Sequence, residues 1–192
     1  MNLQKINVKI YLEKGEDIPL KTFIPLFHRF IQKDLLEGLL VDVAEYTHVH
    51  KGPGVLLIAH EGNYSLDETG GKRGLLYNQK NSSVSSGEEN LKTAWRRALK
   101  ACDLLEKEPE LAGKIKFNPS RMRIYINDRL EASGEDMGSS ELKQTIRPIL
   151  ESLTGSPVRL LKETDPRKLT AFEVEIEKPL KLQDLMGKIQ TP

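Results

Sequence analysis

The sequence predicts an α+β fold: a mixed, largely antiparallel sheet with helices packed on it, arranged as a two-layer α/β sandwich. Segments with the two-residue period of strands and segments with the spacing of helices both occur along the chain. Their order, β-α-β-β-β-α-β-β-α-β-β-α, departs from the strict strand–helix alternation of a doubly wound parallel sheet. With 192 residues, 38% hydrophobic and 30% charged, the chain is predicted to form a single domain over residues 1–192, with a weak subdivision near 78–87.

The N-terminal segment is predicted to form a strand and then a helix. Every second residue from Ile6 to Leu12 is apolar, which indicates a strand with one buried face. Apolar residues then recur at helical spacing, and a helix is expected from residue 20 or 22 to Lys33. Pro25 fits this helix only in its first turn, where no backbone N–H is needed.

Three short apolar runs follow, and each is predicted to be a strand. They cover residues 39–43, 55–59 and 75–77. The run at 55–59 has no polar alternation, so we expect it to be buried on both faces at the centre of the sheet. The polar stretch at 78–87 predicts a surface loop that acts as a lid.

The most clearly marked helix is expected to begin after Ser86 and end near Lys107. Ser86 and Glu89 form a capping box. Cys102 belongs to the apolar stripe and is predicted to be a core residue. The opposite side is predicted to be a solvated helix surface, and it carries Lys92, Arg96, Arg97 and Lys100.

Residues 114–189 are predicted to contain four strands and two helices. Strands are expected at 114–117 and 121–127, joined by a turn at 118–120, and later at 158–161 and 169–177. A helix capped by Ser139 is expected to be kinked at Pro148 and to end at Gly155. A short amphipathic helix from 180 to 189 closes the chain.

Charge and cysteine content exclude several classes of partner and compartment. The formal charge of +1 provides no field for nucleic acid or for an anionic membrane, and no segment approaches a membrane span. A single cysteine cannot form an intramolecular disulfide, and no signal-peptide pattern is present at the start of the chain. A cytoplasmic location is therefore predicted, with no nucleic-acid or membrane partner.

The densest group of polar residues lies between Asp42 and Tyr77. His48, His50 and His60 are candidate metal ligands there, in combination with nearby carboxylates, because imidazole and carboxylate suit zinc or iron. The carboxylates considered are Asp42, Glu45 and Asp67. No HExxH spacing occurs, and the simpler interpretation is that these histidines are solvent-exposed or bonded within the fold.

Candidate binding residues come from the same segment, from two glycine-containing loops and from one later strand. The loops at 51–54 and 70–74 either bind an anion or simply turn the chain. Arg123, Tyr125 and Asn127 share one strand face, which either reads a carboxylate or phosphate or meets solvent. The predicted pocket residues are Asp42, Glu45, Tyr46, His48, His60, Glu61, Tyr64, Arg73 and Arg123.

Several stretches resemble a family of uncharacterised bacterial cytosolic proteins. They are LLVDVAEYTHVHKGPGVLLIAHEGNYSLD, GLLYNQK, RRALKACDLLEKEPELAG and INDRL. The resemblance spans most of residues 5–162 and implies a bacterial cytosolic domain. It implies no activity, cofactor or catalytic residue.

The leading functional hypothesis is a non-catalytic ligand-binding or protein-assembly domain, which recognises a small anionic ligand or a protein partner. The alternative is a small metal-assisted or acid–base hydrolase that uses the 42–77 segment. A third hypothesis is homo-oligomerisation through the terminal helix or an edge strand. The sequence assigns no cofactor and no catalytic residue.

Overall fold

An eight-stranded sheet organises the chain, with the strand order β2-β3-β4-β5-β1-β6-β8-β7. The computed structural model describes residues 3, 5–49, 52–80, 86–126, 137–165 and 169–189. Every neighbouring pair of strands is antiparallel. The strands are β1 Ile6–Lys14, β2 Leu40–Tyr46, β3 Gly54–Ala59, β4 Gly62–Asp67, β5 Gly74–Gln79, β6 Lys116–Ile126, β7 Val158–Lys162 and β8 Thr170–Ile176.

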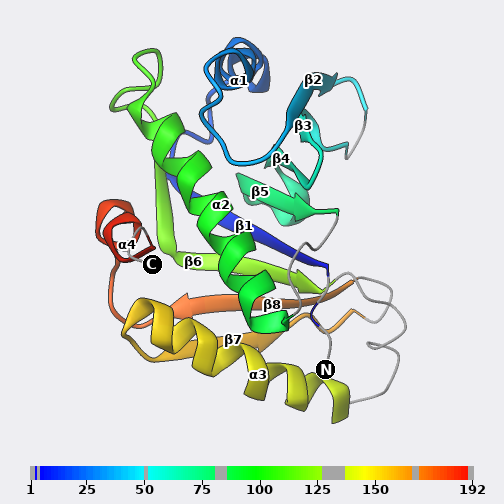
Figure 1. Cartoon of the computed structure of the whole chain (residues 1–192), viewed down its shortest axis with the longest axis vertical. Helices are drawn as coiled ribbons and strands as arrows, with labels where there is room; N and C mark the ends of the chain where they lie inside the picture. The colour runs from blue at the N-terminus through cyan, green and yellow to red at the C-terminus, as the bar shows by residue number, and fades with distance from the viewer. Residues whose placement is uncertain are drawn as a thin grey trace.

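The helices lie on one side of this sheet (Figure 1). They are α1 Phe23–Gln32, α2 Gly87–Lys107, α3 Met137–Thr154 and α4 Leu182–Ile189, with short 3-10 turns at Leu20–Thr22 and Thr69–Gly71. The longest helix, α2, crosses the centre of the sheet over β1 and β5, while α3 packs on the edge strand β7. The predicted α+β class, with helices packed on an antiparallel sheet, is confirmed.

The central strand β1 defines the two faces of the sheet. Ile6, Val8 and Ile10 point toward the helices and are fully buried, and we call this side the helix face. The opposite side, which carries Asn7, Lys9 and Tyr11, is called the open face. Since successive side chains of a strand alternate, the β1 pattern determines which neighbouring residues share each face.

Local sequence signals explain the ends of the helices. The Ser86 hydroxyl accepts a hydrogen bond from the backbone N–H of Glu89 at 3.2 Å, which confirms the predicted cap of α2. Pro25 lies in the first turn of α1, as predicted. Gly155 follows α3 with a φ of +68°, a conformation that glycine adopts without strain. Cys102 is fully buried in the core, as predicted.

Three predictions about the strands are wrong. Gly62–Asp67 forms β4, which the sequence analysis did not identify as a strand. The 55–59 run is not at the centre of the sheet, because β3 is the second strand from the edge and Leu56 and Ile58 remain half-buried. The predicted turn at 118–120 lies inside the continuous strand β6, whose pairing with β1 shifts register there instead.

Parts of the predicted lid at 78–87 belong to defined elements. Asn78 and Gln79 end β5, and Ser86 caps α2. Residues 81–85 lie outside the described residues, as does Asn127. Within the part of the chain that the structure describes, no helix is long and apolar enough to cross a membrane.

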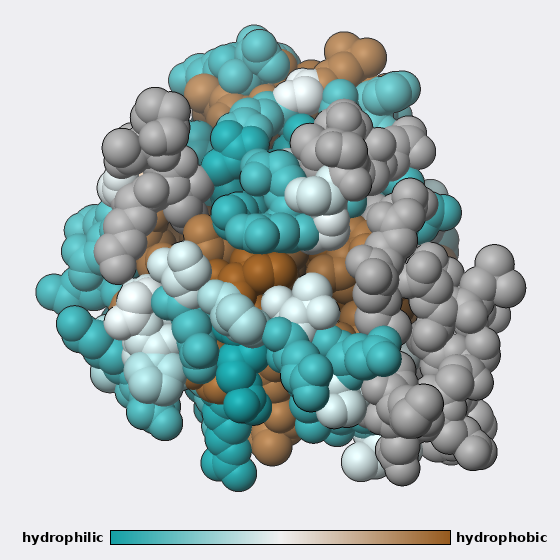
Figure 2. Space-filling model, turned by 60° about the horizontal axis from the view of Figure 1, so that its bottom comes forward, coloured by the Kyte–Doolittle hydropathy of each residue, from teal (hydrophilic) through white to brown (hydrophobic). Residues whose placement is uncertain are grey.

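The end of the molecule that carries α3 is largely hydrophilic. Figure 2 shows the side that lies at the bottom of Figure 1, where hydrophilic residues cover much of the described surface and hydrophobic ones gather near the middle. Leu142, Ile146 and Leu150 of α3 are buried against the sheet. Their four-residue spacing places them on one face of the helix, and this amphipathic pattern accounts for the packing of α3.

Candidate functional site

A buried ion pair lies on the open face of the sheet. Lys9 is completely inaccessible to solvent, and its Nζ donates to Asp67 Oδ2 at 2.5 Å and to the Thr69 carbonyl at 3.0 Å. Asp67 also accepts from the hydroxyl and the backbone N–H of Thr69, at 2.7 and 3.2 Å. A charge removed from water is tolerated only when it is paired and hydrogen-bonded, and here both conditions are met.

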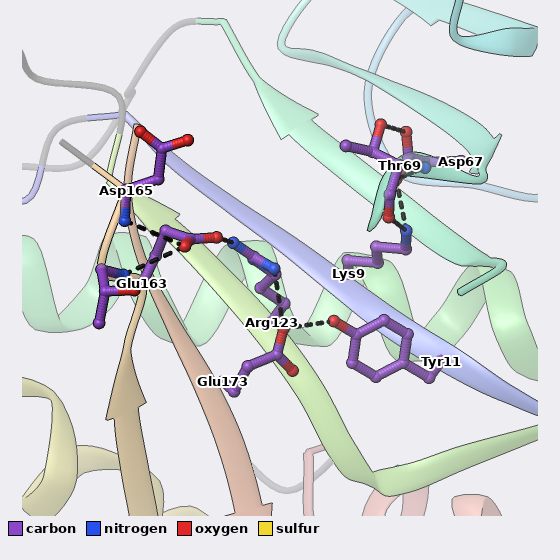
Figure 3. A network of polar contacts seen from close by, with 9 residues as sticks. Lys9, Tyr11, Asp67, Thr69, Arg123, Glu163, Asp165 and Glu173 are labelled. Atoms are coloured by element: carbon purple, nitrogen blue, oxygen red, sulfur yellow. Dashed lines mark hydrogen bonds and ion pairs between the residues drawn. The ribbon is translucent and has the colours of Figure 1, made fainter. Parts of the chain in front are cut away.

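Arg123 forms the second part of this network, directly beside Lys9 in the pairing of β6 with β1. Its Nη1 donates to Glu173 at 2.9 Å and its Nη2 to Glu163 at 2.6 Å. The Tyr11 hydroxyl donates to the same Glu173 at 2.7 Å. Figure 3 shows these side chains converging on the open face, with α2 behind the sheet.

A cavity of about 780 Å³ adjoins this network. One wall is the β2–β3 turn with Val49, a second is the β4–β5 turn at 69–71, and Arg123 and Tyr125 of β6 supply a third. Leu20, Tyr46 and Leu169 complete the apolar part of the lining. The volume and the mixture of apolar walls with few polar groups are typical of small-molecule sites.

The β4–β5 turn connects the cavity to the buried ion pair. Gly70 and Gly71 have φ angles of +80° and +72°, which favour glycine, and a methyl group added to either would meet open space. Thr69, the preceding residue, holds Lys9 and Asp67 through the bonds described above. The ion pair therefore holds the β4–β5 turn, which forms one wall of the cavity, in a fixed position.

Three asparagines continue the polar surface across the open face. Asn7 pairs with Asn78 and Asn78 pairs with Asn63, so the three amides lie side by side on adjacent strands. The Oδ1 atoms of Asn7 and Asn63 are buried and have no hydrogen-bond partner within the described residues. Buried polar atoms without a partner are uncommon, and they often mark places where a water, ion or ligand binds.

Burial changes the acid–base properties of this face. Desolvation lowers the pKa of Lys9 despite the partial compensation by Asp67. Burial also raises the pKa of Tyr125 to about 12, and it raises the pKa of Tyr11, with the Glu173 hydrogen bond acting in the same direction. Both phenols are therefore neutral hydrogen-bonding groups at physiological pH.

The structure brings two of the predicted pocket residues together. Tyr46 and Arg123, which are 77 positions apart, both line the cavity. Of the two interpretations of the Arg123 face, contact with open solvent does not hold for Arg123 itself, since only 16% of its side chain is exposed. Tyr125 accompanies Arg123 with its ring 5.2 Å from the guanidinium carbon.

The candidate metal ligands do not converge. The exposed His48 lies in the turn before β3, and His60, 66% exposed, lies in the turn after it. The six residues of β3 separate these turns by a length of about 20 Å. His50 lies outside the described residues, and within the described part of the chain no group of three potential metal ligands occurs.

Three other predicted pocket residues make local contacts away from the cavity centre. Asp42 is exposed and accepts from the backbone N–H of Val43 at 2.7 Å. Glu45 is exposed, and its bonds with Thr47 and Lys21 lower its pKa. Arg73 binds Glu68 and the Ile18 carbonyl, so it braces the β4–β5 turn.

Glu61 and Tyr64 belong to a second polar cluster, on the helix face. The Tyr64 ring packs against Tyr77 with centroids 4.9 Å apart, and Arg97 Nη1 donates to the Tyr77 hydroxyl at 2.7 Å. Glu61 Oε2, the Tyr64 hydroxyl and Arg97 Nε are buried without a hydrogen-bond partner among the described residues. Arg97 was expected to be solvated, which is wrong, because 13% of its side chain is exposed.

Three members of the open-face network were not predicted from the sequence: Lys9, Glu163 and Glu173. A signal for Glu173 was present, since it alternates with the apolar residues of β8 and pairs directly with Arg123 of β6. Lys9 carried no such signal, because an alternating lysine on a strand normally faces water. Its burial becomes evident only when Asp67, 58 positions away, is placed beside it.

In comparisons with known proteins, no family model matches the chain and no curated protein shows significant similarity to it. The resemblance found in the sequence therefore stays a prediction.

Proposed function

We propose that this protein is a non-catalytic domain that binds a small molecule in the cavity on the open face of its sheet. The observation that carries the proposal is a ligand-sized cavity directly over a buried network of fixed charges. A network whose side chains are held by ion pairs keeps its geometry before a ligand arrives, which lowers the entropy cost of binding.

The hydrolase alternative receives less support from the same geometry. Acid–base chemistry by His60 with Glu61 requires both groups to face a substrate site. Their side chains lie 3.8 Å apart in the β3–β4 turn, whereas the cavity is lined by the β2–β3 turn at the other end of β3. No histidine lines the cavity among the described residues.

Assembly through an edge strand is the second alternative. β2 is an edge strand. The exposed Val41 belongs to it, and the exposed Leu39 directly precedes it. Its pairing with β3 shifts register between Leu40 and Asp42, and the Asp42 carboxylate covers the backbone N–H of Val43. The register shift and the charged side chain of Asp42 both oppose the pairing of β2 with a strand of another molecule. We therefore favour ligand binding over assembly through this edge.

A cytoplasmic location is part of the proposal. It is supported by the single cysteine of the sequence, whose buried thiol has a pKa raised by desolvation and is therefore unreactive.

The cavity can be tested with a matched pair of variants. Val49 lines the cavity and is 45% exposed, while Val41 is 58% exposed and does not line it. We expect fragment-sized compounds, screened by NMR, to shift the backbone amide signals of Gly70 and Gly71. Val49→Trp should weaken these shifts by placing a bulky ring in the cavity, and Val41→Trp should leave them unchanged. Compounds that never reach the two glycines, or that still bind Val49→Trp equally well, would show that the cavity is not the binding site.

A further inference from the structure

We propose that the ligand of this cavity is an uncharged molecule with an apolar body and a hydrogen-bond acceptor, such as a carbonyl or hydroxyl group. This inference rests on the proposed function, because it names the ligand class for the same cavity. It differs from the small anionic ligand that the sequence suggested.

Arg123 is the cationic residue in the lining of the cavity, and both of its Nη atoms already donate to protein carboxylates. An arginine binds a carboxylate or phosphate through two parallel N–H groups. Here Nη1 and Nη2 are engaged by Glu173 and Glu163, the protein's own carboxylates. Each Nη keeps one further N–H, and Nε is buried without a hydrogen-bond partner among the described residues, so donors remain while the charge of Arg123 is already paired with two protein carboxylates.

The charges around Arg123 oppose an anion as well. A carboxylate or phosphate would be placed beside Glu173 and Glu163, and like charges in a partly buried site repel strongly. The neighbouring cation Lys9 offers no compensation, since it is fully buried and bound to Asp67. Glu68, a further carboxylate, also lines the cavity.

A cationic ligand fits no better. A cation has no acceptor for the remaining N–H groups of Arg123. The carboxylates that could attract a cation are already paired, Glu163 and Glu173 with Arg123 and Glu68 with Arg73. A neutral acceptor can take a hydrogen bond from an arginine whose charge is already balanced, and it escapes the repulsion from the carboxylates.

The remaining residues that line the cavity indicate which chemical group the body of the ligand contains. Leu20, Val49 and Leu169 are aliphatic, and the rings of Tyr46 and Tyr125 supply two aromatic surfaces. Burial keeps the Tyr125 phenol neutral, so this part of the wall adds no charge. A flat or compact apolar group is therefore expected to contact these side chains.

Three probes with one ring and different charges test the inference: benzamide, benzoate and benzamidinium. Each is titrated into the isotope-labelled full chain, and the shifts of the Gly70 and Gly71 amides and of the arginine Nε–H signals are followed. We expect benzamide to bind at least about tenfold more tightly than benzoate, which the carboxylates repel, and than benzamidinium, which has no acceptor for Arg123.

Two variants separate the role of Arg123 from a general effect of charge. Arg123→Lys keeps the charge and loses the planar donors, so benzamide should bind about tenfold more weakly, whereas Arg97→Lys on the helix face should leave its affinity unchanged. Should Arg123→Lys fold poorly, Glu173→Gln provides a second test. It removes one repelling carboxylate, and benzoate should then bind about tenfold more tightly than it does to the wild type.

Two results would overturn the inference and leave the proposed function intact. One is tighter binding of benzoate or benzamidinium than of benzamide at the two glycines. The other is failure of all three probes at a cavity that other fragments still enter. If no compound of any kind reaches the glycines, the proposed function fails together with the inference.

Discussion

Two arginines, one on each face of the sheet, are buried in similar ways and serve different purposes. Both guanidinium groups lie near a tyrosine ring, at 5.2 Å for Arg123 and Tyr125 and at 5.8 Å for Arg97 and Tyr77. Both have a buried Nε without a hydrogen-bond partner among the described residues. Their partners and surroundings, however, are not alike.

Arg123 is bound by two carboxylates and lines a cavity, whereas Arg97 donates to a neutral phenol between the sheet and α2. The carboxylate of Glu37, which is 47% exposed, lies 3.8 Å from the Nε of Arg97. A buried arginine is thus not a functional signal by itself. Arg123 differs from Arg97 because the carboxylates of Glu163 and Glu173 fix its position while the cavity lies beside it.

The largest expected effect comes from the buried ion pair under the cavity wall. Lys9→Met leaves Asp67 as a buried carboxylate without its cation, so the free energy of unfolding should fall by about 3–5 kcal/mol. Urea denaturation followed by circular dichroism measures this change. The double variant Lys9→Met/Asp67→Asn should recover a large part of the loss, because no unpaired charge is left behind.

If the single and double variants prove equally unstable, the loss comes from packing and not from the charge. The fixed network would then be unnecessary for the cavity, and the contrast between the two arginines would lose its basis.

The sequence predicted the layers of this fold well and the open-face network poorly, for a physical reason. Periodicity reports which residues share a face, so the buried side of β1 and the stripe of α2 could be recognised. It does not report strand order, and the network depends on β1 lying between β5 and β6. Arg123 and Tyr46 could be proposed from residue type alone, but their meeting at one cavity requires the curvature of the sheet and its turns.

The missed strand β4 illustrates a second limit. Tyr64 and Leu66 alternate with polar residues and do face the core, so the pattern of a strand was present. The turn that precedes β4 consists of His60 and Glu61, and these side chains suggested a chemical site more strongly than a hairpin. Tight turns and catalytic sites use the same polar residue types, so the sequence alone does not distinguish one from the other. The geometry of the side chains is needed for that distinction.

An intermediate effect is expected from removing each arginine in turn. Arg123→Met leaves Glu163 and Glu173 close to each other and mostly buried, and should cost about 2–3 kcal/mol, below the range for fully buried pairs. Arg97→Met removes the donor to the Tyr77 phenol and the cation near the exposed Glu37 carboxylate, and it should cost about 1 kcal/mol. Guanidinium denaturation of both variants gives the two values side by side. If Arg97→Met lowered the free energy of unfolding more than Arg123→Met, the comparison would be reversed. The helix-face cluster would then contribute more to stability than the open-face network.

The smallest expected effects distinguish the tyrosines of the two faces. The Tyr64 hydroxyl is buried without a hydrogen-bond partner among the described residues, so Tyr64→Phe removes an unsatisfied group and should change the free energy of unfolding by less than about 0.5 kcal/mol. The Tyr11 hydroxyl donates to Glu173, and Tyr11→Phe should cost about 1 kcal/mol. Each variant removes one phenolic hydroxyl, so the two form a matched pair. Thermal and chemical denaturation measures the free energy of unfolding of both. A clear loss in Tyr64→Phe would mean that its hydroxyl binds a water or ligand, and the helix face would then contain a binding site of its own.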